Sequence, residues 1–247
     1  MLVSIIPFSR LMDSSRRHHR YYDLLLAAFV VVLLCSNFIG AGKAAVIELP
    51  HFGEVTFGAG ILFFPIAYFF GDIFTEVYGY AYDRRAVWAG FAALAFAAVM
   101  AQIVIALPVA PGAYMANYQH GLESVFGNSW RIALASMFSF WCGSFANSYV
   151  LAKMKILTEG RFLWMRTIGS TAAGELVDSS LFYMLAFYGI WPTYEIFQVA
   201  LAQYVLKTSW EALATPLTYF VVNFLKRKEN EDYYDTHTNF TPFKVKV

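Results

Sequence analysis

The sequence has little charge. Only 14% of its 247 residues are Asp, Glu, Lys or Arg, whereas 59% are hydrophobic. Soluble domains are about one quarter charged, and a soluble globule of this size needs a charged surface that this composition does not supply. The high hydrophobicity and the net charge of +1 also exclude an intrinsically disordered chain. The composition therefore predicts a polytopic membrane protein.

The sequence also lacks the motifs of metal sites, disulfide frameworks and nucleotide hydrolysis. Its two cysteines, Cys35 and Cys142, lie in apolar stretches without zinc-binding spacing. It contains no Gly-rich phosphate loop and no Walker motif, so we expect no ATP hydrolysis by this chain alone. We expect no metal, no cofactor and no nucleic-acid partner.

Six apolar stretches are long enough to cross a bilayer, because a helix needs about 20 residues to span the roughly 30 Å hydrocarbon core. They cover residues 21–41, 57–80, 87–109, 132–152, 167–190 and 196–225. The last is long for one crossing, and Pro216 predicts a kink in it, with a tilted helix as the alternative. We therefore predict an all-α integral membrane domain of six helices over residues 21–225.

The cationic residues are distributed unevenly around these stretches. Fifteen of the 18 Lys and Arg fall in the N-terminal segment, the second and fourth loops and the C-terminal tail. Lys43 and Arg131 fall on the opposite side, and Lys207 lies within the sixth stretch. The positive-inside rule places both termini in the cytoplasm: a basic segment, residues 1–20, and a polar, solvated or partly disordered tail, residues 226–247.

A secretory signal peptide is the alternative interpretation of the first stretch. Basic residues precede an apolar run that ends near Leu34, and small residues follow it. Its removal would leave five stretches and an external amino terminus. The long basic segment and the continuation of the run into Ser36 and Asn37 favour a transmembrane helix.

Ionisable residues occur inside the apolar stretches, where a charge costs roughly 2.5–3.5 kcal/mol at the bilayer centre on insertion scales. They are Asp72 and Glu76 in the second stretch, Glu175 and Asp178 in the fifth, and Lys207 and Glu211 in the sixth. Five acids cannot all be neutralised by one base. Either some of the acids are protonated or a cation completes the site, and both arrangements favour a transporter.

The acids of the second stretch form a pair. Asp72 and Glu76 are four residues apart and share a helix face. Pro65 frees a backbone carbonyl one turn earlier and predicts an unwound point beside a site. Because Glu76 lies near the cytoplasmic end, a salt bridge to Arg84 or Arg85 is the alternative to a functional role.

The acids of the fifth stretch and the base of the sixth form a second candidate group. Glu175 and Asp178 are three residues apart and share a helix face. A purely structural role for both would require two well-placed donors. Lys207 either pairs with Glu211, four residues later on its own helix, or reaches across to Asp72, Glu175 or Asp178.

These residues resemble those of the queuosine precursor transporter family, also grouped as vitamin uptake transporters. The resemblance covers nearly the whole chain, in order and on a six-span layout. The matching residues are Ser36 and Asn37, Phe64 and Pro65 with Asp72, residues 76–79, residues 170–178 with Phe182, and Tyr204 with Lys207.

The resemblance implies import of a 7-deazaguanine compound across a bacterial inner membrane. The candidates are 7-cyano-7-deazaguanine, its 7-aminomethyl relative and the base queuine. It also implies a fold similar to the six-helix substrate-binding subunits of vitamin transporters, working without an ATPase module. We expect a small-molecule substrate and the lipid bilayer as partners, and a homodimer is left open.

A carboxylate can accept both N–H groups of a guanine-like edge, and an amide offers a donor and an acceptor to the carbonyl edge. Aromatic side chains can stack on the flat heterocycle. The predicted substrate-binding residues are Asn37, Phe64, Tyr68, Asp72, Glu175, Asp178, Phe182, Tyr204 and Lys207. The predicted coupling or gating residues are Glu76 and Glu211. For Asn37, a hydrogen bond that joins two helices is the alternative.

Two other functions stay open at this point. One is a substrate-binding subunit that needs an external ATPase module. The other is an intramembrane enzyme in which Asp72 and Asp178, on separate helices, act as acid and base in the manner of aspartyl proteases. The residues favour a transporter that is not an enzyme.

Overall fold

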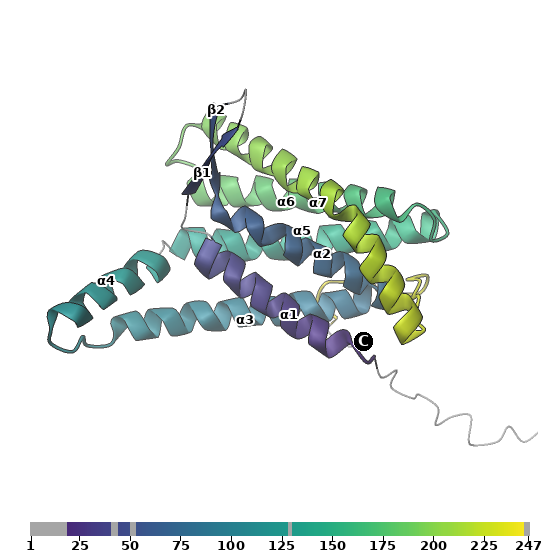
Figure 1. Ribbon diagram of the computed structural model, residues 1–247, viewed down its shortest axis with the longest axis horizontal. Coiled ribbons are helices and arrows are strands. Elements are labelled where there is room, and N and C mark those ends of the chain that lie inside the picture. Colours follow the sequence, from purple (N-terminus) through teal and green to yellow (C-terminus); the bar gives the residue numbers. More distant parts are fainter. Residues whose placement is uncertain (1–18, 41–43, 50–52, 128–129, 245–247) are drawn as a thin grey trace, which may run out of the picture.

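The computed structural model describes residues 19–40, 44–49, 53–127 and 130–244. Seven α-helices occur in these ranges: α1 (Tyr22–Cys35), α2 (Phe64–Ile73), α3 (Tyr80–Ala106), α4 (Ala113–Phe126), α5 (Trp130–Leu157), α6 (Leu163–Phe187) and α7 (Thr193–Glu229). The longer helices lie side by side as a bundle, from one end of which α4 projects (Figure 1). The fold is all-α apart from one β-hairpin.

Every predicted apolar stretch contains one of the bundle helices, so the helical character of all six is confirmed. Two helical segments, Tyr22–Ile39 and Tyr80–Ala106, are long and apolar enough by length and composition to cross a membrane. The basic segment up to residue 18 and Lys43 lie outside the described residues, so the structure gives no view of that part of the predicted charge asymmetry.

The second helix begins later than predicted. Strand β2 (Gly53–Gly58) pairs antiparallel with β1 (Ala44–Leu49), and a 3₁₀ turn at Ala59–Leu62 leads into α2. Predicting a transmembrane α-helix from residue 57 was wrong, because residues 57 and 58 belong to β2 and residues 59–62 form the 3₁₀ turn; hydrophobicity alone does not distinguish a short strand from a helix end. Pro65 lies in the first turn of α2, where its missing N–H costs no helical hydrogen bond, and it therefore marks the helix start.

The connection from α2 to α3 is irregular. A π-helical turn at Phe74–Tyr78 follows α2 directly and ends at Gly79, whose φ of 90° is a conformation that glycine adopts without strain. The ring of Tyr233 occupies the space that a side chain on Gly79 would need. This turn therefore carries Glu76 away from a regular helix and against the C-terminal tail.

Close approach of α5 and α6 sets the centre of the bundle. A Cβ atom on Gly143 would lie 3.0 Å from the main-chain oxygen of Gly174, and one on Gly174 would lie 2.9 Å from that of Gly143. Such small residues let two helices pack with their backbones nearly in contact. The acids of α6 are thereby held close to the polar side chains of α5.

Helix α7 is a single helix of 37 residues with Pro216 inside it. Figure 1 shows it bending where its colour passes from green to yellow. Proline removes one helical hydrogen bond and crowds the preceding turn, which accounts for the bend. The predicted kink in the sixth stretch is thus confirmed.

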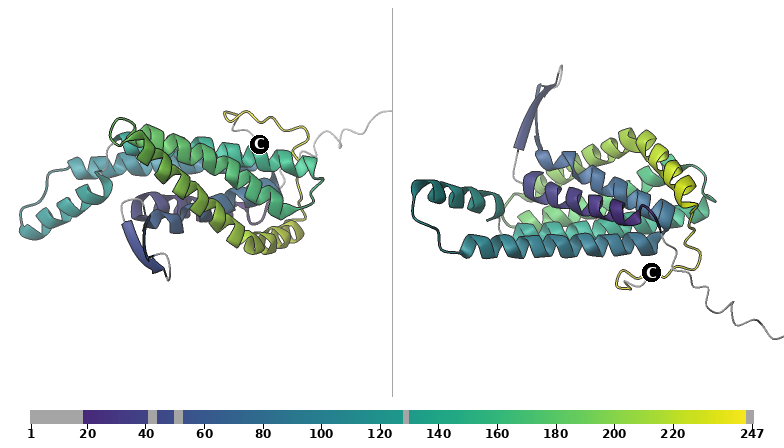
Figure 2. Two further views of the ribbon diagram at one scale, coloured as in Figure 1. Left: turned by 90° about the horizontal axis from the view of Figure 1, so that it is seen from above. Right: turned by 60° about the horizontal axis from the view of Figure 1, so that its bottom comes forward.

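The C-terminal tail packs against the end of the bundle opposite α4 (Figure 2). Both carboxylate oxygens of Asp235 accept the main-chain N–H of Tyr80, at 3.2 and 3.1 Å. Arg84 Nη1 donates to the main-chain oxygens of Asn239, at 2.7 Å, and Thr241, at 2.9 Å. The tail is therefore tied to α3 at these points, whereas most of residues 230–244 remain exposed, as expected of a solvated tail.

The residue before α3 is Gly79, which has no side chain to cap the helix. Asp235 of the tail caps the N-terminus of α3 in its place. We expect Asp235→Ala to lower the free energy of unfolding by about 1 kcal/mol, the usual loss for a helix cap. Asp235→Asn keeps the acceptor and should lose less. Thermal unfolding of the purified protein in detergent measures both. His237→Ala, an exposed change in the same tail, is the control, and an Asp235→Ala midpoint equal to that of the control would contradict the capping role.

Candidate functional site

A cavity of about 400 Å³ lies within the bundle, near the end that carries α4. This volume falls in the range of small-molecule sites. Its walls are largely apolar and include the aromatic side chains of Phe38, Phe64, Phe126, Trp130, Phe182 and Trp191. Its polar lining includes Asn37, Gln102, Ser136, Asp178, Gln203 and Lys207. Apolar walls with a few polar groups suit a flat molecule that carries hydrogen-bonding edges.

The floor of the cavity is an ion triad between α6 and α7. The Nζ atom of Lys207 lies 2.8 Å from Glu175 Oε2 and 2.8 Å from Asp178 Oδ2. The ring of Phe64 faces the same ammonium group, with its centroid 4.9 Å away. Of the predicted alternatives, Lys207 therefore reaches across to α6 and does not pair with Glu211. Asp178 and Lys207 both line the cavity, whereas Glu175 lies behind them.

Asn37 combines the two roles that its sequence position left open. It lies in a π-helical turn, Ser36–Gly40, that extends α1. Its Nδ2 donates to the main-chain oxygen of Leu33 at 2.9 Å, and its Oδ1 accepts the hydroxyl of Ser136 on α5 at 3.1 Å. It therefore joins two helices and lines the cavity at the same time.

Of the four aromatic residues that were predicted to contact the substrate, two line the cavity and two do not. Phe64 and Phe182 line the cavity. Tyr68 is only 4% exposed and lies at the crossing of α5 and α6, where its hydroxyl would be 2.7 Å from a Cβ atom on Gly143. Tyr204 is not among the described cavity-lining residues. Substrate contact by these two tyrosines stays a prediction.

Gln203, and not its neighbour Tyr204, lines the cavity on α7 beside Lys207, and it was not among the predicted substrate-binding residues. The signal was present, because Gln203 is four residues before Lys207 and so shares its helix face. Ser136 and Trp191 also line the cavity and were not predicted.

Two buried carboxylates form a middle layer below the cavity floor. Asp72 accepts one hydrogen bond from Asn147 Nδ2, at 2.9 Å, and its second oxygen has no hydrogen-bond partner among the described residues. Within the same described ranges, neither oxygen of Glu211 has one. Both side chains are 0% exposed, and the two carboxylates would repel each other if both were ionised. Neither lines the cavity.

A cluster of charges, here called the end cluster, closes the far end of the bundle. It consists of Glu76, Lys155, Arg166, Lys226 and Asp232. Glu76 Oε1 lies 2.7 Å from Arg166 Nη2 and 2.6 Å from Lys226 Nζ. Lys155 Nζ lies 3.7 Å from the same oxygen and donates to the main-chain oxygen of Glu76 at 2.7 Å. Four segments of the bundle and the tail therefore meet at Glu76.

Asp232 brings the tail into the end cluster. It lies 2.6 Å from Lys155 Nζ and 2.9 Å from Lys226 Nζ. Partial burial raises the pKa of Asp232, but the hydrogen bonds and charges of the two lysines outweigh this, so that its pKa lies below the ordinary value. The carboxylate is therefore held in its charged form.

The sequence-based alternative for Glu76, a salt bridge to Arg84 or Arg85, was wrong. Arg84 donates to the main chain of the tail, and Arg85 is exposed. Helical spacing pointed to partners nearby in sequence, whereas the partners of Glu76 come from α5, α6 and α7.

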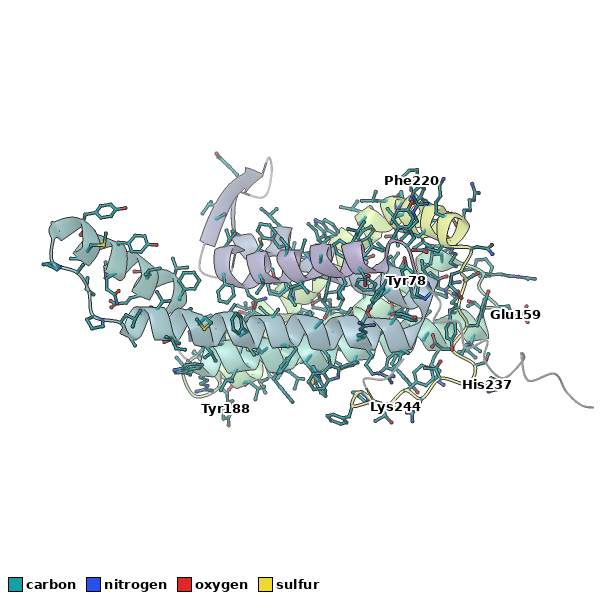
Figure 3. The ribbon with its side chains drawn as sticks, turned by 90° about the horizontal axis from the view of Figure 1, so that it is seen from below. Tyr78, Glu159, Tyr188, Phe220, His237 and Lys244 are labelled. Carbon is teal, nitrogen blue, oxygen red and sulfur yellow. The ribbon has the colours of Figure 1, made fainter. Side chains whose placement is uncertain are left out.

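The charged layers follow one another along the bundle. On α7, Lys207 comes first, then Glu211, and Lys226 last. On α2 and its π-helical turn, Phe64 of the cavity precedes Asp72, which precedes Glu76. Figure 3 shows the two ends of the bundle, with Tyr188 after α6 at the cavity end and Glu159 after α5 at the end-cluster end. A molecule in the cavity thus faces an ionic floor, an acidic middle layer and a closed end in that order.

Comparison with known proteins gives this arrangement a context. A family model described as "Putative vitamin uptake transporter" matches residues 58–221, which include the cavity floor and the middle layer. The chain is 30% identical over 185 residues to a Bacillus subtilis (strain 168) protein named "Probable queuosine precursor transporter", a match that covers 74% of this chain and 80% of that protein. No solved structure matches the chain. On these matches, the chain belongs to the vitamin uptake transporter family.

Proposed function

We propose that this chain is a secondary transporter that imports a queuosine precursor across the bacterial cytoplasmic membrane. The observation that carries the proposal is the cavity floor, where Asp178 and Lys207 face an aromatic-walled space of about 400 Å³. Membership of a transporter family and the name of the Bacillus subtilis relative support it. The substrate is a 7-deazaguanine base: 7-cyano-7-deazaguanine, 7-aminomethyl-7-deazaguanine or queuine.

The chemistry of the cavity suits such a base. A 7-deazaguanine presents two N–H donor groups on one edge, which the Asp178 carboxylate can accept side by side. The amide of Gln203, which lines the cavity, offers a donor for the carbonyl edge. Phe64 and Phe182 provide faces on which the flat ring stacks. Glu175 helps by holding Lys207 in place, so that Asp178 keeps acceptor capacity for the substrate.

The closed end supplies the second element of a transporter, a gate. Substrate bound on the floor reaches the other side only if the end cluster separates, because Glu76 ties α5, α6, α7 and the tail together. In this proposal Glu76 is the gating residue, and the structure corresponds to the state that is open at the α4 end.

The membrane arrangement is part of the same proposal. The bundle helices that carry the six apolar stretches cross the bilayer, with both termini in the cytoplasm. The end cluster then lies on the cytoplasmic side, where an excess of Lys and Arg is expected. Exposed apolar side chains on α3, among them Phe96, Val99 and Ile103, suit contact with lipid.

We expect the purified chain alone, in proteoliposomes, to take up labelled 7-cyano-7-deazaguanine. Asp178→Asn should lower the initial rate at least tenfold, because losing one charge-assisted hydrogen bond and the partner of Lys207 costs about 1.5–3 kcal/mol. Asp23→Asn, an exposed acid on α1, is the matched control and should transport as the wild type does. Both variants should reconstitute in equal amounts.

Uptake by Asp178→Asn at the wild-type rate would contradict the assignment of the floor. Uptake that appears only when an ATPase module is added would identify the chain as a binding subunit instead. Unlabelled adenine should not compete with the labelled base, because it lacks the 2-amino and N1–H donors that Asp178 accepts.

Cysteine labelling tests the orientation. With Cys35 and Cys142 replaced by alanine, we expect Tyr114→Cys on α4 to react with a membrane-impermeant maleimide in intact cells. Glu159→Cys, in the exposed loop after α5, should react only after the cells are permeabilised. The reverse pattern would place the cavity mouth in the cytoplasm and contradict the proposed direction of opening.

A further inference from the structure

Glu211 is a buried acid that neither the cavity floor nor the end cluster uses. Its side chain is 0% exposed, and both of its carboxylate oxygens lack a hydrogen-bond partner in the part of the chain that the structure describes. Thr215, one turn later, donates its hydroxyl to the main-chain oxygen of Glu211 at 3.0 Å and so does not serve the carboxylate. An ionised carboxylate in this position would have nothing to compensate its lost hydration.

The charged groups on the elements packed against α7 do not provide that compensation. The buried ones are Asp72 on α2, Glu76 on the π-helical turn, Arg166, Glu175 and Asp178 on α6, and Lys207 on α7 itself, with Lys226 of α7 in the end cluster. Lys207 is shared between two other acids at 2.8 Å each. Glu76 is occupied by the cations of the end cluster. Asp72 and Glu175 repel a negative charge on Glu211. This conformation therefore favours the neutral, protonated form of Glu211.

Glu211 is also placed where a coupling group is needed. It lies four residues after Lys207, about 6 Å further along the helix axis and on the same face. It therefore lies just below the cavity floor and above the end cluster. A group between an open cavity and a closed gate can exchange protons with one side in each state of the gate.

The Tyr68 hydroxyl supplies a polar group between the cavity floor and the middle layer. It is 4% exposed as a residue, has no hydrogen-bond partner among the described residues and interacts electrostatically with Asp72, Glu175 and Asp178. An unsatisfied hydroxyl at this point can donate or accept a proton-carrying hydrogen bond.

The surroundings favour a proton over a metal cation. Within the described residues, no group of three or more His, Cys, Asp or Glu side chains converges closely enough to hold a metal ion. Hard cations need several oxygen ligands around one point, whereas a proton needs a single carboxylate oxygen. Glu211 offers an unpartnered carboxylate oxygen for a proton, but in the described part of the chain it does not belong to a group of several ligands that could hold a metal cation.

We infer that Glu211 binds and releases the proton that drives substrate import, an inference that rests on the proposed transport function. With the cavity open to the outside, the carboxylate takes one proton from the external solution and an O–H bond forms. After the end cluster opens, that bond breaks and the proton leaves to the cytoplasm with the substrate. One proton and one substrate molecule then cross in each cycle, and the carrier returns empty.

The test uses the full chain in proteoliposomes with the membrane potential clamped at zero by potassium and valinomycin. With the interior alkaline by one pH unit, wild type should accumulate uncharged 7-cyano-7-deazaguanine about tenfold, the ratio that one proton per substrate sustains. Glu211→Gln should accumulate it to a ratio of about one. It should still exchange labelled for unlabelled substrate without a gradient. Glu195→Gln, in the first turn of the same helix, is the control and should accumulate as wild type does.

The possible failures are distinguishable. Wild type that neither accumulates nor exchanges the base overturns the proposed function itself. Wild type that exchanges without pH-driven accumulation, or accumulates only with a sodium gradient, overturns the proton inference alone, as does full accumulation by Glu211→Gln.

If Glu211→Gln does not fold, Glu211→Asp provides the test. A shortened carboxyl group at this position should shift the external pH at which accumulation is half-maximal. A pH profile identical to that of wild type would overturn the inference.

Discussion

The contact of Lys207 with Glu175 and Asp178 is the interaction on which the site depends. It joins α6 to α7, and Phe64 brings α2 to the same ammonium group. Because Lys207 is committed to two acids of α6, Glu211 on its own helix has no counter-ion among the residues that the structure describes. Because Lys207 is shared with Glu175, it neutralises only part of the negative charge of Asp178, which lines the cavity. The cavity floor and the unpaired acid below it are therefore two consequences of one ion triad.

The cost of placing charge in an apolar environment explains the order of the layers. Paired charges form the floor, and the end cluster combines three cations with two acids where the tail packs against the bundle. Between them, Asp72 has a single donor in Asn147 and Glu211 has none in the described ranges. A bundle that is tied by charges at one end, holds a cavity near the other and has unpartnered acids in between has the features that alternating access requires.

The sequence predicted the helices of the bundle and the cavity floor, because long apolar runs and misplaced charges are local signals. Glu175, Asp178 and Lys207 were recognisable by spacing and by their cost at membrane depth. The partners of Glu76 were not recognisable. Lys155, Arg166 and Lys226 are distant from it in sequence, and each is also what the positive-inside rule expects of a cytoplasmic loop or tail. The docked tail and the strand before α2 were missed for a related reason. Asp235 caps α3 through tertiary contact, and hydrophobicity alone does not separate strand from helix over residues 57–63.

The most direct measurement is a structure of the chain with 7-cyano-7-deazaguanine bound. The account predicts the ring in the aromatic-walled cavity, with its N1–H and 2-amino groups about 2.7–3.1 Å from the Asp178 carboxylate. Lys207 should keep its contact with Glu175 in that complex. A ligand bound away from this cavity, or bound in it without contact to Asp178, would contradict the central claim.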